Sequence, residues 1–168
     1  MSRGFAGVGL FNAKNAMNIG GAMRAAFNYE AAFIGVAGTR YQRIPTDTIA
    51  AWKHIPLVHT EDILSLCPHD CVPVAIELVD GARSLPMYTH PERAFYVFGP
   101  EDGSIPARIV ERCRDVVAVP TRNCMNLAAT VNVVLYDRLA KQMRDVSREN
   151  RDARMAKLQV VGGSAAAV

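Results

Sequence analysis

The sequence predicts an α/β protein built on a mostly parallel sheet of five to six strands with helices on its faces. Short apolar runs of the kind found in buried strands alternate along the chain with segments of helical periodicity. Polar loops follow the apolar runs and lead directly into the helical segments, as in parallel sheets. The 168 residues, half of them hydrophobic, suffice for one complete core. We therefore expect a single domain over residues 1–146 and a C-terminal tail over residues 147–168, where the periodicity is lost.

The apolar runs and the periodic segments set the expected order of elements. Strands are expected over residues 7–11, 32–37, 72–79, 93–98 and 116–119, and helices over residues 19–29, 60–66, 106–114 and about 125–146. Pro120 ends the last strand, because proline cannot donate to a central ladder. Asn18 is the expected N-cap of the first helix, since its side-chain oxygen can accept from the free amides of the first turn.

Two consecutive glycines, Gly20 and Gly21, lie in the first turn of that helix. Each glycine costs a helix up to about 1 kcal/mol relative to alanine. Close packing of the helix against the sheet would explain them, and so would a ligand or phosphate group near the backbone. The sequence leaves both explanations open.

The composition excludes several classes of protein. No apolar run approaches the roughly 20 residues that span a bilayer, and the N-terminus lacks the apolar stretch of a secretory signal, so we expect a cytoplasmic protein without membrane contact. Four cysteines do not suggest a disulfide framework in a chain of this size. Cys67 and Cys71 lack a second Cys/His pair at finger-like spacing, so no metal site is expected.

A polar and aromatic region over residues 38–56 separates the second strand from the next helix. Its cations alternate with aromatic side chains, a pattern that can hold nucleic acid by phosphate contacts and base stacking. A solvated loop that covers the sheet is an equal alternative. The candidate RNA-binding residues of the whole chain are Arg24, Arg40, Arg43, Lys53 and Arg122.

An open parallel sheet could also bind a dinucleotide, as in oxidoreductases. The first strand is followed by an Asn-rich segment and not by Gly-x-Gly-x-x-Gly. No acidic residue follows the second strand, where the chain reads Ala37-Gly-Thr-Arg40. Both observations argue against a dinucleotide site.

The polar residues of interest cluster in three loops that join a strand to a helix. These are Asn15, Asn18 and Arg24 in the first, Gly99, Glu101 and Gly103 in the second, and Arg122, Cys124 and Asn126 in the third. Loops at the carboxyl edge of a parallel sheet converge, so the three are expected to form one site. The structural alternative is that they are loop and capping residues, with Arg24 in a surface ion pair.

The three segments resemble, in order and separation, the three motifs of the SpoU (TrmH) branch of the SPOUT RNA methyltransferases. They read Asn15-Ala-Met-Asn18-Ile-Gly20-Gly-Ala-Met-Arg24, Phe98-Gly-Pro-Glu101-Asp-Gly-Ser-Ile-Pro106 and Val119-Pro-Thr-Arg-Asn-Cys124-Met-Asn126-Leu-Ala-Ala-Thr-Val-Asn-Val-Val-Leu-Tyr136-Asp137. The resemblance covers about residues 5–145 and is closest to the smallest members, which methylate the tRNA wobble nucleotide.

The resemblance implies a C-terminal deep trefoil knot, an obligate homodimer and S-adenosylmethionine (SAM) as cofactor. The implied reaction is methyl transfer to a ribose 2′-hydroxyl of RNA, with tRNA ahead of rRNA. The implied cofactor-binding residues are Ile76, Gly99, Val119, Cys124 and Met125, and the implied catalytic residues are Arg24, Asn18, Glu101 and Asn126. Because a guanidinium stays protonated, we expect Arg24 to hold a phosphate and stabilise the developing alkoxide rather than to act as a base.

Two departures from the family pattern favour a further alternative. Cys124 stands where the third motif usually has serine, and a thiol is the poorer hydrogen-bond donor. Gly103 lies two residues after Glu101 instead of three, with Ser104 in the usual place of the glycine. A knotted RNA-binding dimer that has lost catalysis is therefore an alternative to the enzyme.

Overall fold

The computed structural model describes residues 4–38 and 53–145. Contacts divide the chain into two compact units, Met1–Asp137 and Arg138–Val168, and the sheet and its loops belong to the first. The tail expected over residues 147–168 lies outside the described residues, so the domain boundary near residue 146 stays a prediction.

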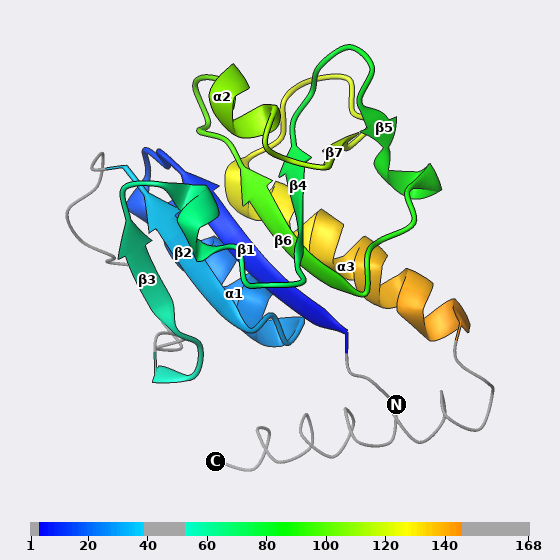
Figure 1. Cartoon of the computed structure of the whole chain (residues 1–168), viewed down its shortest axis with the longest axis horizontal. Helices are drawn as coiled ribbons and strands as arrows, with labels where there is room; N and C mark the ends of the chain where they lie inside the picture. Colours follow the sequence, from blue (N-terminus) through cyan, green and yellow to red (C-terminus); the bar gives the residue numbers. More distant parts are fainter. Residues whose placement is uncertain (1–3, 39–52, 146–168) are drawn as a thin grey trace. The chain divides into compact units, whose positions relative to one another are not determined.

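The first unit is built on one parallel sheet of seven strands, seen face-on in Figure 1. The strands are β1 (Phe5–Phe11), β2 (Phe33–Ala37), β3 (Leu57–Thr60), β4 (Val72–Ile76), β5 (Arg83–Ser84), β6 (Arg93–Phe98) and β7 (Asp115–Ala118). Their order is β3-β2-β1-β6-β4-β7-β5, and every neighbouring pair is parallel. The predicted α/β class with a mostly parallel sheet is confirmed.

The sheet has more strands than expected because two of them carry weak signals. β5 has two residues, which is too short for an apolar run. β3 is an edge strand whose central residues, Val58 and His59, are exposed. It therefore lacks the apolar run by which a buried strand is predicted. The trefoil knot implied by the family resemblance stays a prediction.

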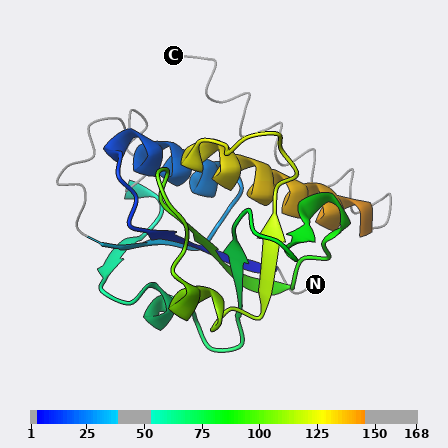
Figure 2. The ribbon, with the colours of Figure 1, turned by 90° about the horizontal axis from the view of Figure 1, so that it is seen from above.

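Helices cover both faces of the sheet, as Figure 2 shows from above. The α-helices are α1 (Ala16–Asn28), α2 (Ala107–Val110) and α3 (Leu127–Asp145), and the short 3-10 helices are η2 (Ile63–Leu66) and η3 (Leu85–Met87). α1 and the part of α3 up to Asp137 lie on one face, while η2 and α2 lie on the other. None of the described helices has the length and apolarity of a membrane span.

Burial on both faces explains why the central strand β6 is apolar from Ala94 to Phe98. Ala94, Tyr96 and Phe98 join the core under α1 and α3, whereas Phe95 and Val97 join the core under η2 and α2. All five side chains are buried. A strand segment that is covered on both sides has apolar residues at successive positions. The strand could therefore be predicted from this apolar run in the sequence.

Several predicted boundaries were wrong at the ends of elements. The N-cap of α1 is Asn15 and not Asn18, since the Asn15 side chain accepts from the backbone N–H of Met17 at 2.8 Å. Asn18 lies in the first turn and is buried. β4 ends at Ile76 instead of residue 79, and α2 ends at Val110 instead of residue 114.

The glycine pair of α1 has a packing explanation in one of its members. A Cβ atom on Gly21 would lie 2.7 Å from the Cβ of Ala128 in α3, closer than real Cβ atoms approach. Gly21 therefore permits close packing of α1, although the neighbour is a helix and not the sheet.

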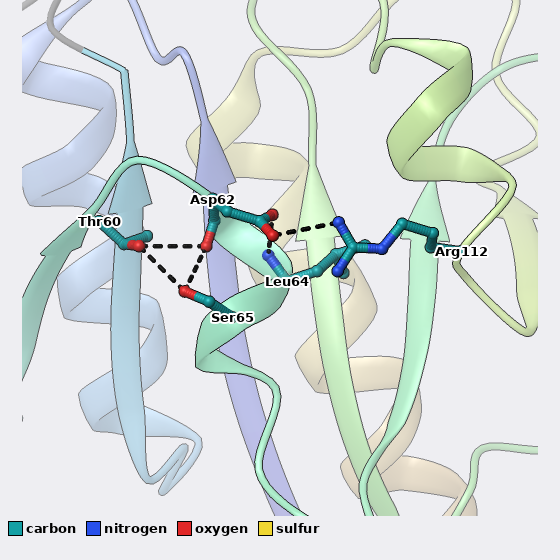
Figure 3. Close-up of polar contacts among 5 residues, drawn as sticks. All are labelled: Thr60, Asp62, Leu64, Ser65 and Arg112. Carbon is teal, nitrogen blue, oxygen red and sulfur yellow. Dashed lines mark hydrogen bonds and ion pairs between the residues drawn. The ribbon is translucent and has the colours of Figure 1, made fainter.

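A polar cluster joins η2 to the segment after α2 (Figure 3). The Asp62 side chain accepts from the Leu64 backbone N–H at 3.1 Å and pairs with Arg112 at 3.1 Å, which lowers the pKa of Asp62. Thr60 was predicted to open the helix here, but it ends β3, and Asp62 is the N-cap. Because Asp62 and Arg112 are largely exposed, the pair contributes at most about 1 kcal/mol.

His90 lies in a buried network that the sequence did not indicate. Its side chain is 3% exposed, with Nδ1 2.6 Å from the Tyr96 hydroxyl and Nε2 2.9 Å from the Asp137 carboxylate. His90→Ala is expected to lower the free energy of unfolding by about 2–4 kcal/mol, because it removes two hydrogen bonds and leaves a cavity. Urea denaturation measures this loss.

The matched control is His69→Ala, which removes a side chain that is 95% exposed. Its effect on the unfolding free energy should stay within about 0.5 kcal/mol. A loss equally small for His90→Ala would contradict the network.

Candidate functional site

Glu101 ties the loop after β6 to the loop after β1. Its carboxylate accepts from the backbone N–H of Lys14 at 2.9 Å and of Asn15 at 3.3 Å, and from the side-chain amide of Asn18. Burial raises the pKa of Glu101, but these hydrogen bonds outweigh burial and leave the pKa below its ordinary value. The side chain is therefore an ionised acceptor at neutral pH.

Asn126 ties the third loop to the same cluster. Its Nδ2 donates to Oδ1 of Asn18 at 2.8 Å, and its Oδ1 accepts from the backbone N–H of Ala129 in the first turn of α3 at 3.2 Å. A continuous hydrogen-bonded path thus runs from Glu101 through Asn18 to Asn126. The three loops converge as expected from the parallel sheet.

A first pocket opens at the carboxyl ends of β4, β6 and β7. Its cavity volume is about 110 Å³. Its lining residues are Ile76, Glu77, Leu78, Phe98, Gly99, Pro100, Glu101, Gly103, Val119, Thr121, Cys124, Met125, Leu127 and Thr130. The five residues predicted to bind a cofactor all line this pocket.

A second pocket, lined mostly by residues with polar side chains, adjoins the first. Its lining residues are Lys14, Asn15, Asn18, Glu101, Asp102, Cys124, Met125 and Asn126. The two pockets share Glu101, Cys124 and Met125. Three of the four predicted catalytic residues, Asn18, Glu101 and Asn126, line the second pocket.

The remaining candidates within the described residues do not line either pocket. Arg24 is exposed on α1, and Lys53 and Arg122 are exposed as well. Arg40 and Arg43 lie outside the described residues. Of the five basic candidates, Arg24, Lys53 and Arg122 are thus exposed residues that line neither pocket.

Glu77 is a pocket residue that was not predicted from the sequence. Its carboxylate accepts from the backbone N–H of Leu78 at 3.0 Å and of Ile105 at 2.7 Å. The predicted strand over residues 72–79 placed Glu77 inside the sheet. A single carboxylate in an apolar run, just before the turn at Asp80 and Gly81, was the signal that the strand ends there.

The described residues contain no group of His, Cys, Asp and Glu side chains with the arrangement of a metal site. All four cysteines are free thiols, and Cys124 is the exposed one, at the border of both pockets. Burial raises the pKa of the Cys113 thiol to about 11.

Solved structures share this fold. The SpoU methyltransferase AviRb from Streptomyces viridochromogenes, in complex with the cofactor AdoMet, superposes with a TM-score of 0.75 at 16% identity, over 85% of this chain and 60% of that chain. The A. aeolicus TrmH/SpoU tRNA modifying enzyme gives 0.75 at 15% identity, over 93% and 87%. A structure concerning the 2-OH methylation of C/U34 on tRNA gives 0.73 at 18% identity, over 84% and 93%.

This chain therefore spans about 60% of the length of AviRb but matches the other two structures over most of their length. A comparison with curated protein sequences gave no match. The model of the SpoU rRNA Methylase family matches residues 7–136, which include all three convergent loops. The chain belongs to the SpoU rRNA Methylase family.

Proposed function

We propose that this chain is a SAM-dependent methyltransferase that acts on a ribose 2′-hydroxyl of RNA, with tRNA as the substrate. The observation that carries the proposal is the adjacency of the two pockets: one at the strand ends, the other lined by the Glu101–Asn18–Asn126 path. Membership of the SpoU rRNA Methylase family supports methyl transfer to RNA. The AdoMet bound to AviRb supports SAM as the cofactor.

The residues of the first pocket fit SAM. A Cβ on Gly99 would lie 3.0 Å from Cγ1 of Ile105 and 3.3 Å from Oε2 of Glu77, so a side chain here would crowd both neighbours. No hydrogen-bond partner occurs among the described residues for the backbone N–H groups of Cys124 and Met125, which border the pocket. An adenine needs an apolar slot with a few such backbone groups.

When bound, SAM would supply an activated methyl group on its sulfonium centre. Ile76, Gly99, Val119, Cys124 and Met125 would hold it in the first pocket. An acceptor ribose in the second pocket would then lie beside it, because Glu101, Cys124 and Met125 border both pockets. Holding two reactants next to each other accounts for much of the rate enhancement in such transfers.

Asn18, Glu101 and Asn126 act in this proposal by holding the three loops in register. Each makes at least two hydrogen bonds across or within the loops. The exposed Cys124 replaces the serine of the family pattern at the border of the pockets. A thiol is a weaker hydrogen-bond donor than a hydroxyl, so in this proposal backbone groups and the side chains of Asn18 and Asn126 position the reactants.

The choice of tRNA is supported by two solved structures whose descriptions name tRNA. The structure concerning 2-OH methylation on tRNA is covered over 93% of its length, and the A. aeolicus TrmH/SpoU tRNA modifying enzyme over 87%. The proposal includes the homodimer, the trefoil knot and a cytoplasmic reaction. It also assigns RNA contacts to the five predicted basic residues, Arg24, Arg40, Arg43, Lys53 and Arg122.

Labelled methyl transfer to total tRNA and to rRNA tests the proposal. The full chain with SAM should label tRNA, and nuclease digestion should yield a 2′-O-methylated nucleoside. Label in rRNA alone would move the substrate to rRNA. Calorimetry that detects no SAM uptake would contradict the enzyme and favour an RNA-binding protein that has lost catalysis.

A further inference from the structure

Among the residues that the structure describes, Lys14 is the only basic one that lines either pocket. It lies in the loop between β1 and α1, and its backbone N–H donates to Oε2 of Glu101 at 2.9 Å. This hydrogen bond holds the backbone of Lys14 in place at the second pocket. Its ammonium group pairs with the Asp102 carboxylate at 3.2 Å.

The ion pair between Lys14 and Asp102 is easily exchanged. The two side chains are 60% and 42% exposed. Pairs of this kind contribute about 0–1 kcal/mol to stability, because water solvates both charges well. Another anion that reaches the ammonium group can replace Asp102 at little cost.

The charges around the second pocket explain why a cation is needed there. The other charged residues known to line it, within residues 4–38 and 53–145, are Glu101 and Asp102, and both are acidic. RNA carries a negative charge on every phosphate, so two carboxylates alone would repel it. The 2′-hydroxyl is attached to the ribose carbon next to the one that bears the 3′-phosphate. An acceptor ribose therefore always brings a phosphate to the mouth of this pocket.

We propose that Lys14 binds the phosphate beside the acceptor ribose and that Asp102 holds its ammonium group when no RNA is present. The inference rests on the proposed function and names one substrate-binding residue outside the three motifs. A lysine suits the role because its ammonium is a compact charge with three donors on a flexible stem.

Binding of unfractionated tRNA to the full chain, measured by fluorescence anisotropy at several salt concentrations, tests the inference. Lys14→Gln should raise the Kd for tRNA roughly five- to tenfold. It should also reduce the slope of log Kd against log salt by about 0.7–0.9, the value for one lost phosphate contact. The SAM affinity, from calorimetry, should change less than about twofold, since Lys14 does not line the first pocket.

Three variants make the comparison specific. Lys14→Arg keeps the charge and should retain most of the affinity. Asp102→Asn frees Lys14 and removes a negative charge, so tRNA should bind about two- to fivefold more tightly. Arg93→Gln removes a positive charge at the amino end of β6, at the opposite edge of the sheet from the pockets, and should leave the tRNA affinity within about twofold.

Two results would overturn the inference. One is equal weakening by Lys14→Gln and Arg93→Gln, or none by either. The other is equal loss of thermal stability and SAM affinity in Lys14→Gln and Asp102→Asn, which would make the pair a structural bridge between loops. Failure of the proposed function is separate: a chain that binds tRNA through Lys14 but takes up no SAM would disprove the enzyme and keep the phosphate contact.

Discussion

Replacing Arg24 with alanine is expected to reduce methyl transfer about a hundred- to a thousandfold while the SAM affinity stays unchanged. The size is that of removing one group that stabilises developing negative charge. SAM binding should persist because Arg24 is exposed on α1 and does not line the first pocket. Single-turnover transfer to tRNA and calorimetry with SAM measure the two quantities separately.

The geometry makes the Arg24 prediction demanding. Arg24 follows Asn18 by six residues, which is about 9 Å along the helix axis and places it on another side of α1. Arg24→Lys is the matched control: it keeps the charge and loses the planar fork, so an intermediate rate is expected. Unchanged turnover in Arg24→Ala would mean that the residue has a surface role and that the assignment by resemblance is wrong.

Replacing Glu101 with alanine is expected to lower both activity and stability. The substitution deprives the backbone N–H groups of Lys14 and Asn15 and the amide of Asn18 of their acceptor. The free energy of unfolding should fall by about 2–3 kcal/mol. Water limits this loss, because it can accept hydrogen bonds from some of the N–H groups that lose the carboxylate. Methyl transfer should fall about a hundredfold, because Glu101 lines both pockets and its loss would disturb the alignment of the two reactants.

Glu101→Gln is the matched control, since it keeps one oxygen acceptor and removes the charge. The pKa of Glu101 in the folded chain lies below its ordinary value of 4.5. The ionised carboxylate therefore stabilises the fold at pH values above 4.5. This stabilisation is lost as the pH falls through the folded pKa. The stability difference between wild type and Glu101→Gln should therefore be full at neutral pH and shrink below pH 4.5. A difference that stays constant with pH would contradict the carboxylate cluster.

Much of the fold was predictable because its signals are local. β6 is buried on both faces, so it appears in the sequence as an unbroken apolar run. The exposed edge strand β3 and the two-residue β5 lack that signal, and both were missed. The start of α1 was misplaced because Asn15 and Asn18 are equally good caps by type, and only the bond to Met17 distinguishes them.

The residues of the candidate site were predictable for a different reason. Parallel strands bring the loops at their carboxyl ends together, so polar residues at three such loops had to converge. Glu77 was missed because the end of β4 depends on which backbone groups its carboxylate accepts from, and one of these belongs to Ile105. The network of His90 was missed because Asp137 is 47 residues away along the chain.

The sequence by itself determined the sheet class, the order of most elements and the membership of Asn18, Glu101 and Asn126 in one polar cluster. Periodicity and loop position carry that information, since both follow from neighbouring residues. Only the tertiary structure decided that the two pockets share lining residues, that the exposed Arg24 lines neither of them, and that Lys14 pairs with Asp102. Those facts depend on distances between loops more than 80 residues apart, and residue order alone does not set them.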